Sequence, residues 1–311
     1  MSYILPKTSP AFVLDKQVIE TSAEQLNLLR EQAGCRVLYS IKSLPFKPLL
    51  HCLQPVVDGF SVSSLFEAKL AAEVLENTQS IHLATPGIRP DEVSELNQLC
   101  SHISFNSLSQ QANFLTQNPC AVSQGLRINP QLSFLSDDRF NPCRLHSKLG
   151  VPLDTLIPSD LERVEGIQLH TVFSQQNFQP LVKTLKKLEQ HLGATLASLA
   201  WINLGGGYLF QKIHDLQPFI AIVKRLQDRY GLEVYIEPGK DVVGQSMYLV
   251  ATVIDCFTSD GKIIAVLDTS INHNPEVFEF QRQPAIAESN SLGKHAAILA
   301  GSTCLAGDIF G

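Results

Sequence analysis

The chain has 311 residues, of which 44% are hydrophobic and 17% are charged, and its formal net charge is −6 at pH 7. This length and apolar content suffice for a large buried core and for about two domains. The acidic balance removes the usual electrostatic basis for a nucleic-acid partner, because phosphate binding needs clustered Lys and Arg side chains.

The N-terminal segment and the cysteines indicate in which cellular compartment we expect the protein. The leading segment MSYILPKTSP has neither the basic residues nor the apolar stretch of a secretory signal. No run of about eighteen apolar residues occurs, so we expect no membrane span. The seven cysteines are scattered without a CxxC pair, which is typical of free thiols in a reducing compartment and not of a disulfide framework or zinc site. We therefore expect a cytoplasmic protein without a metal.

Short apolar runs rich in β-branched residues alternate with segments of helical period along most of the chain. The expected strands are 36–41, 56–62, 80–84, 102–105, 121–128, 164–170, 201–204 and 233–237. The expected helices are 66–76, 90–99, 108–116, 180–192 and 218–230. This alternation predicts a parallel sheet in an α/β fold, and eight repeats predict closure into a (β/α)₈ barrel. A doubly wound open sheet is the alternative.

Two regions depart from this alternation. The polar segment 129–161, between the fifth and sixth expected strands, has a length that is typical of a functional or mobile loop. After the last barrel strand, residues 246–257, 262–267 and 296–300 are expected to form strands with no clear helix between them. This pattern predicts a second, antiparallel β domain.

The predicted β domain contains few strands before the chain ends at Gly311. The extended residues 3–5 are expected to add one more. We therefore expect an incomplete β domain formed by residues 1–11 and 242–311, next to a barrel of residues 12–241.

Chemically useful residues stand at the carboxyl ends of the expected strands, where (β/α)₈ barrels place their function. These are Lys42, His170, the triplet Gly205-Gly206-Gly207 and the turn Glu237-Pro238-Gly239. Each one alone has an ordinary interpretation as a solvated cap, a core histidine or a flexible turn. Together they predict one site, because a glycine nest binds phosphate and barrel phosphate sites follow the seventh and eighth strands. A lysine nearby predicts a covalent bond to a phosphorylated aldehyde cofactor.

The order of motifs along the chain resembles one enzyme family. The motifs YSIKS, SSLFEAKL, GLRINP, NPCRLHSKLGV, GIQLHT, LGGG, EPG and TCLAGD are similar to those of the pyridoxal-phosphate group IV decarboxylases, which include diaminopimelate, ornithine and arginine decarboxylases. FNPCRLHSKLGV, LDTS followed by HNPEVFEF, and GSTCLAGDIFG resemble the subfamily that acts on carboxynorspermidine and carboxyspermidine. The resemblance implies an alanine-racemase-like barrel and a role in polyamine biosynthesis.

The resemblance also implies a role for each residue of the expected site. Lys42 is expected to carry pyridoxal 5′-phosphate, with His170 stacked on its ring. Glu237 is expected to face the pyridine nitrogen and keep it protonated, which improves the ring as an electron sink. The phosphate is expected on Gly205, Gly206, Gly207 and Gly239. Cys304 is expected to enter from a second subunit and protonate the carbanion carbon, which implies a homodimer with shared active sites.

A small-molecule substrate with a long cationic tail needs acidic side chains along its path. Asp308 and Glu276 are the candidates, with Glu279 less favoured. His273 and Lys148 lie in segments that resemble substrate-supporting loops, so we expect them to bind substrate as well.

The chain departs from the subfamily at several positions. Gln168 stands where the subfamily usually has His, Phe173-Ser174 replaces Cys-Glu, and Lys240 follows EPG where relatives have Arg or Glu. Leu305 after Cys304 favours the carboxynorspermidine type, because ornithine and diaminopimelate enzymes place an acid there.

Three other functions stay open at this point. One is decarboxylation of diaminopimelate, ornithine or arginine. Another is a truncated, non-catalytic relative that binds only the cofactor or a partner chain. The third is an amino-acid racemase, which needs a Tyr as second base in the β domain, where Tyr248 lies inside an expected strand.

Overall fold

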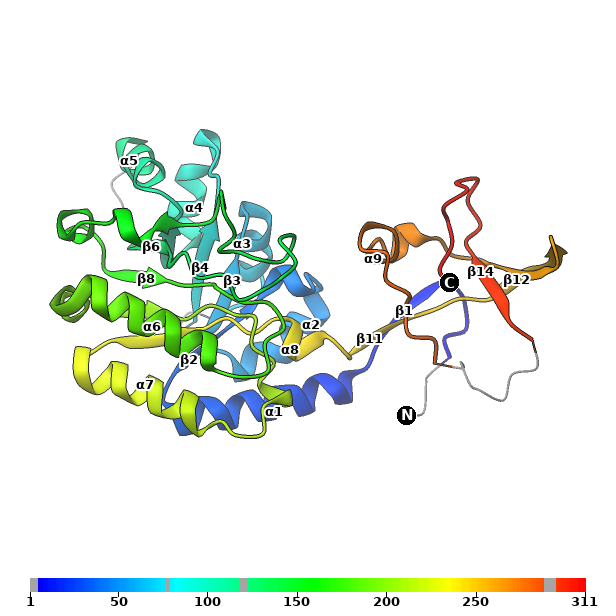
Figure 1. The fold of residues 1–311 in the computed structure, drawn as a ribbon, viewed down its shortest axis with the longest axis horizontal. Coiled ribbons are helices and arrows are strands. Elements are labelled where there is room, and N and C mark those ends of the chain that lie inside the picture. The colour runs from blue at the N-terminus through cyan, green and yellow to red at the C-terminus, as the bar shows by residue number, and fades with distance from the viewer. Residues whose placement is uncertain (1–4, 77–78, 118–121, 288–294) are drawn as a thin grey trace. The chain divides into compact units, whose positions relative to one another are not determined.

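The computed structural model of the chain describes residues 5–76, 79–117, 122–287 and 295–311 (Figure 1). It divides into two compact units. One unit consists of Lys16–Ser246, and the other combines Met1–Asp15 with Met247–Gly311. Each unit is described separately below. Within the described residues, no helix is both long enough and apolar enough to span a bilayer.

The larger unit is built around a closed parallel barrel. Its eight strands are β2 (Arg36–Ser40), β3 (Gly59–Val62), β4 (Ser80–Thr85), β5 (His102–Phe105), β6 (Ser123–Asn129), β8 (Gly166–Gln168), β9 (Trp201–Asn203) and β10 (Glu233–Ile236). Each strand pairs in parallel with the next, and β10 pairs back onto β2 through Tyr235 and Arg36. The predicted (β/α)₈ barrel is confirmed, and the open sheet is wrong because the ring of strands closes.

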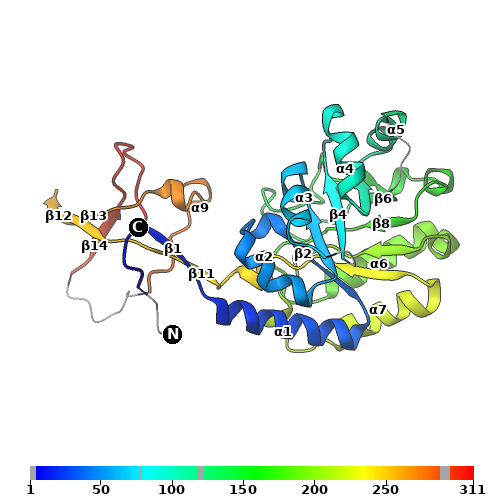
Figure 2. The ribbon, with the colours of Figure 1, turned by 180° about the vertical axis from the view of Figure 1, so that it is seen from behind.

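Helices surround this barrel (Figures 1 and 2). They are α1 (Lys16–Ala33), α2 (Lys47–Leu53), α3 (Leu65–Ala72), α4 (Val93–Leu99), α5 (Leu108–Gln117), α6 (Gln179–Leu192), α7 (Gln217–Tyr230) and the short α8 (Lys240–Val243). In α6, Leu181, Leu185, Leu188 and Leu192 recur at helical spacing and are buried, which gives the helix one apolar face for the barrel. Pro180 in its first turn fixes the backbone for helix initiation.

Helices α1, α2 and the short α8 of this unit were not expected from the sequence. Helix α1 buries Ile19, Ala23, Leu26, Leu29 and Ala33. Their helical period is visible in the sequence, but it precedes the first barrel strand and therefore lies outside the strand–helix alternation. Helix α2 is a short segment between β2 and β3. The segment 129–161 also contains structure, namely β7 (Val151–Pro152), which pairs with β6, and two short 3₁₀ turns.

Aromatic rings fill the barrel toward the amino-terminal ends of its strands. The imidazoles of His82 and His102 stack with centroids 3.8 Å apart, and Trp201 and Tyr235 pack around them. A Cβ at position 166 would lie 2.0 Å from the Trp201 ring, so Gly166 provides the room for this indole. This end of the barrel is therefore packed and closed, which leaves the opposite end for a site.

The smaller unit contains two sheets. Strand β1 (Ala11–Leu14) pairs antiparallel with β11 (Met247–Val250). Strand β12 (Val253–Ser259) pairs antiparallel with β13 (Lys262–Leu267), and β13 pairs in parallel with β14 (Ala297–Ala300). The predicted second β domain is confirmed, while the single strand expected at 246–257 is divided between the two sheets. Of the strand expected at 3–5, Tyr3 and Ile4 lie outside the described residues.

The core of the smaller unit is small. Ile271, Val277 and Phe310 are buried together, and Leu267 and Leu299 pack against them. Val277 belongs to the one-turn helix α9 (Glu276–Glu279). The cluster connects the segment after β13 with the segment after β14, so it holds both against the sheet.

Candidate active site

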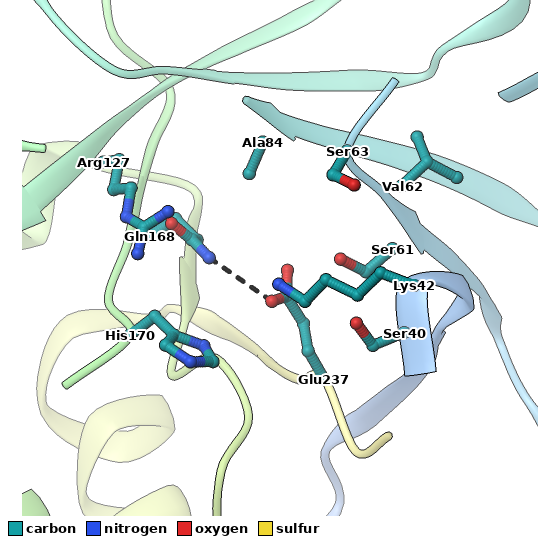
Figure 3. Close-up of a pocket in the computed structure, with 10 residues that line it drawn as sticks. All are labelled: Ser40, Lys42, Ser61, Val62, Ser63, Ala84, Arg127, Gln168, His170 and Glu237. Carbon is teal, nitrogen blue, oxygen red and sulfur yellow. Dashed lines mark hydrogen bonds between the residues drawn. The ribbon is translucent and has the colours of Figure 1, made fainter. Parts of the chain in front are cut away.

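A pocket opens at the carboxyl ends of the barrel strands (Figure 3). Its lining comes from β2, β3, β4, β6, β8 and the segments that follow β2, β3, β8 and β10. The lining residues are Ser40, Lys42, Ser61, Val62, Ser63, Ala84, Arg127, Gln168, His170 and Glu237. Three of the residues predicted from the sequence, Lys42, His170 and Glu237, therefore meet in one pocket.

Lys42 follows β2 in a single 3₁₀ turn, Ile41–Ser43. Its side chain is exposed and points into the pocket (Figure 3). The end of β2 is fixed to the turn after β10, because the Ser40 N–H donates to the Pro238 carbonyl over 3.0 Å. The lysine amine and the Glu237 segment are thus held on neighbouring strands of the closed ring.

Glu237 is a buried carboxylate, 5% exposed, with an amide donor for each oxygen. Asn203 Nδ2 donates to Oε1 over 2.8 Å, and Gln168 Nε2 donates to Oε2 over 3.3 Å. Both donors are themselves buried at the ends of β9 and β8. Hydrogen bonds from two neutral donors offset part of the cost of burying the carboxylate without adding a positive charge.

His170 follows β8, and its ring lines the pocket. Burial lowers the pKa of His170 well below its ordinary value of 6.5, and the positive charges of Lys42 and Arg127 lower it further. The Gly206 N–H donates to His170 Nδ1 over 3.3 Å, so Nδ1 carries a lone pair and the ring is neutral. A neutral imidazole here adds no charge to a pocket that already contains two cations.

At the predicted glycines, atoms of neighbouring segments come too close to leave room for a side chain. A Cβ at Gly206 would lie 2.2 Å from the Glu237 carbonyl oxygen, and one at Gly239 would lie 2.0 Å from Ser43 Oγ. The N–H groups of Gly205 and Gly206 are already used, by Asn203 Oδ1 at 2.9 Å and by His170. Within the described part of the chain, the N–H groups of Gly207 and Gly239 donate no hydrogen bond. These two are the backbone donors that are available to an anion.

Several residues of the pocket were missed from the sequence. Arg127 near the end of β6 is buried and lines the pocket, although only its motif GLRINP was noted. Burial lowers the pKa of Arg127, and the negative charge of Glu237 opposes this shift. Asn203 and Gln168 also stand at strand ends. All three are polar residues at or near the end of a barrel strand, so a sequence search that included every polar residue there, and not only Lys, His and Glu, would identify them.

Cys304 lies in the smaller unit, in the turn between β14 and the end of the chain, and its thiol is exposed. Asp308 follows Cys304 in the same segment, and its side chain is buried. Its carboxylate accepts hydrogen bonds from the backbone N–H groups of Ile271 and Thr303 over 2.8 and 3.1 Å, and from the Thr303 hydroxyl. Burial opposes ionisation of Asp308, but these hydrogen bonds outweigh it and lower the pKa. Asp308 therefore holds the Cys304 turn in place; substrate binding by Asp308 stays a prediction.

The other substrate-binding candidates have surface positions. Glu276 begins α9 and lies 3.9 Å from Arg282, with both side chains largely exposed. His273 Nδ1 is 2.8 Å from the Thr269 hydroxyl. In the larger unit, Lys148 is exposed, and its carbonyl accepts a hydrogen bond from Asn106 Nδ2 over 2.8 Å. Of these residues, Lys148 does not line the pocket around Lys42.

Comparison with known proteins identifies the family. The model of the family described as pyridoxal-dependent decarboxylase, C-terminal sheet domain, matches residues 11–311. The chain belongs to the pyridoxal-dependent decarboxylases. The family resemblance, the carboxy-lyase class and the cofactor expected from the motifs are thereby confirmed.

Individual relatives of this decarboxylase have related names. Carboxynorspermidine/carboxyspermidine decarboxylase of Campylobacter jejuni is 31% identical over 97% of this chain and 82% of that protein. Carboxyaminopropylagmatine decarboxylase of a Synechocystis species is 33% identical over 97% of this chain and 79% of that protein. The crystal structure of C. jejuni carboxynorspermidine decarboxylase with norspermidine superimposes with a TM-score of 0.86 at 31% identity, covering 98% of this chain and 83% of that one.

The residues in and around the pocket of this decarboxylase fit the chemistry of pyridoxal phosphate. Lys42 is an exposed amine at the mouth of the pocket, and the free N–H groups of Gly207 and Gly239 suit a phosphate. Glu237 supplies a buried anion for a protonated ring nitrogen, and His170 supplies a neutral ring. Gln168 Oε1 is buried and has no hydrogen-bond partner among the residues that the structure describes. The donor set therefore matches the amine, acid and anion-binding groups that this cofactor requires.

Proposed function

We propose that this decarboxylase converts carboxynorspermidine or carboxyspermidine to norspermidine or spermidine. The observation that carries the proposal is the convergence of Lys42, Glu237 and His170 on one pocket of a chain that matches such decarboxylases along almost its whole length. The relative that acts on carboxyaminopropylagmatine favours this third compound as the alternative substrate. All three compounds carry a carboxyl group on the aminopropyl end of a long cationic amine.

Pyridoxal phosphate, when bound, supplies an electron sink for the electron pair that remains when CO₂ leaves. Lys42 would hold the cofactor covalently through its amine. The Glu237 carboxylate, with both oxygens held by amide donors, would keep a proton on the cofactor ring nitrogen. The neutral ring of His170 would pack against the cofactor, and the N–H groups of Gly207 and Gly239 would bind its phosphate.

The proton that replaces CO₂ needs a donor on one face of the carbon. We assign it to Cys304 of a second subunit, in a cytoplasmic homodimer with shared sites. The exposed Cys304 thiol suits a donor that enters another subunit, and buried Asp308 fixes the turn that presents it. We assign the cationic tail to Glu276, which is exposed on α9, and not to Asp308, because the carboxylate of Asp308 is already hydrogen bonded.

Release of CO₂ from a panel of substrates tests the proposal. Carboxynorspermidine, carboxyspermidine and carboxyaminopropylagmatine are compared with diaminopimelate, ornithine and arginine at equal concentration. We expect the highest kcat/KM within the first three compounds. Preference for any of the last three overturns the substrate assignment, and cofactor binding without turnover of any compound favours a non-catalytic relative.

Mixing two inactive variants tests the shared site. Lys42→Ala and Cys304→Ala subunits each lack one required group, but a mixed dimer contains one site with both. Recovery of activity on mixing supports the homodimer. No recovery, or a monomer by light scattering, overturns it.

A further inference from the structure

We infer that Gln168 is a positioning residue that separates Arg127 from Glu237, so that the carboxylate stays available to the cofactor ring nitrogen. The inference rests on the proposed function, because it assumes that the cofactor occupies the Lys42 pocket. It concerns a position where this chain has a neutral amide and the related subfamily usually has a histidine.

The three side chains lie in sequence across the pocket. Figure 3 shows the Gln168 carboxamide between the Arg127 guanidinium and the Glu237 carboxylate. Gln168 Nε2 donates to Glu237 Oε2 over 3.3 Å, so the amide oxygen faces away from Glu237. That oxygen is buried and has no hydrogen-bond partner within the described residues. A buried acceptor of this kind needs a hydrogen-bond donor. The Arg127 guanidinium lines the same pocket and carries five N–H donors.

Arg127 and Glu237 attract each other without touching. Both are buried, at 8% and 5% exposure, and the charge of Glu237 acts on Arg127 through space. The described part of the chain contains no ion pair between them. In a buried site, direct contact of a guanidinium with a carboxylate is strong, because water does not screen it. The Gln168 amide prevents that contact, because its Nε2 group already donates to Glu237 and its Oε1 offers an acceptor to Arg127.

The separation has a chemical consequence for the cofactor. A Glu237 carboxylate that pairs with Arg127 is largely neutralised and binds a protonated ring nitrogen less well. With Gln168 in place, the hydrogen bonds to the Glu237 oxygens within the described residues come from two neutral amides, those of Gln168 and Asn203. The negative charge then stays available to the cofactor ring nitrogen. Gln168 and Asn203 thus set the position of Glu237, while Gln168 alone controls its access to Arg127.

Substitution of Gln168 separates this role from simple packing. Gln168→Leu keeps a side chain of similar size but leaves Glu237 Oε2 without its amide donor and Arg127 without an amide acceptor, so Arg127 turns toward Glu237. We expect pyridoxal phosphate binding to weaken by about tenfold to a hundredfold, as for a lost hydrogen bond to a buried charge. The absorption band of the bound cofactor should shift as well. Gln168→His restores a donor at the subfamily position, and we expect binding and spectrum near those of the unsubstituted protein.

A second substitution tests whether Arg127 causes the weaker cofactor binding that we expect in Gln168→Leu. In Gln168→Leu combined with Arg127→Met, no guanidinium remains to neutralise Glu237, so we expect tighter cofactor binding than in Gln168→Leu alone. Unchanged affinity and spectrum in Gln168→Leu, or a double variant that binds no better than the single one, overturns the inference. Circular dichroism and thermal melting establish that each variant is folded.

If Gln168→Leu does not fold, a crystal structure of the unsubstituted protein with bound pyridoxal phosphate tests whether Gln168 separates Arg127 from Glu237. We expect Gln168 between the two ions, with Arg127 on Oε1 and Glu237 on the ring nitrogen. A direct ion pair between Arg127 and Glu237 overturns the inference. Trapping of the cofactor on a lysine other than Lys42 instead refutes the proposed function, so the two failures are distinguishable.

Discussion

Asn203 joins the carboxylate of Glu237 to the glycine loop that begins at Gly205. Its Nδ2 donates to Glu237 Oε1 over 2.8 Å, and its Oδ1 accepts the N–H of Gly205 over 2.9 Å. One buried amide, 1% exposed, therefore fixes both the carboxylate that we propose for the cofactor ring nitrogen and the glycine loop that we propose for its phosphate. Rigid elements that hold polar groups in this way give a site its geometry before the ligand binds.

The first prediction concerns Glu237. Glu237→Gln keeps the shape but removes the negative charge that stabilises a protonated ring nitrogen, so we expect kcat to fall by about 10²–10⁴-fold, with the cofactor still bound. Steady-state kinetics and the visible spectrum measure both. Glu233→Gln is the matched control, because Glu233 begins the same strand and contacts Arg36 and Tyr235 at the other end of the barrel. A kcat within tenfold of the unsubstituted protein contradicts the assigned role.

The second prediction concerns Lys42. With pyridoxal phosphate the protein should absorb in the visible, and borohydride should fix the cofactor on a single peptide that contains Lys42. Lys42→Ala should abolish both signals. Lys148→Ala should leave them unchanged, because Lys148 does not line the pocket. Mass spectrometry that finds the adduct on another lysine refutes the site.

The third prediction concerns the backbone approach at Gly206. Gly206→Ala places a Cβ 2.2 Å from the Glu237 carbonyl oxygen, so the backbone must shift. We expect a loss of about 1–3 kcal/mol in the free energy of unfolding, typical of overpacking, and weaker cofactor binding. Gly87→Ala is the control, because a Cβ there meets nothing within 4 Å. Equal stability and affinity for the two variants in urea unfolding and cofactor titration contradicts the prediction.

The fourth prediction concerns stability at acid pH. Burial, and then the neighbouring His102, lowers the pKa of His82 well below 6.5 in the folded protein. Below pH 6.5 the unfolded chain therefore binds a proton that the folded chain excludes, and the free energy of unfolding falls by about 1.4 kcal/mol per pH unit for each such proton. Above pH 6.5 this dependence vanishes. In urea unfolding between pH 7.5 and 5.5, His82→Phe should reduce the slope of the free energy of unfolding against pH below pH 6.5, by an amount that approaches one proton as the pH falls, and an unaltered slope contradicts the prediction.

The fifth prediction concerns Cys304. Cys304→Ala removes the proposed proton donor, so we expect decarboxylation to slow by about a hundredfold or more while the cofactor adduct on Lys42 persists. Cys256→Ala is the control, because Cys256 is also an exposed thiol of the smaller unit. Activity measurements that show equal effects for both variants rule out a specific role for Cys304.

The fold and three of the residues that line the pocket could be predicted because their signals are local. Strand and helix periods repeat along the chain, and a residue at a strand end is brought to the mouth of a barrel by the topology alone. Lys42, His170 and Glu237 were found for this reason. The division of 246–257 into β11 and β12 was not, because a continuous apolar run does not record which sheet each half joins.

The partners of each polar group were decided only by the tertiary structure. Gln168 and Glu237 are far apart in the sequence, as are Asn203 and Glu237, and their hydrogen bonds exist only because β8, β9 and β10 are neighbours in the closed ring. The same closure commits the N–H groups of Gly205 and Gly206 to internal acceptors. The sequence determined which chemical groups stand at the mouth of the barrel. Their hydrogen-bond partners follow from distances between strands, and residue order does not contain those distances.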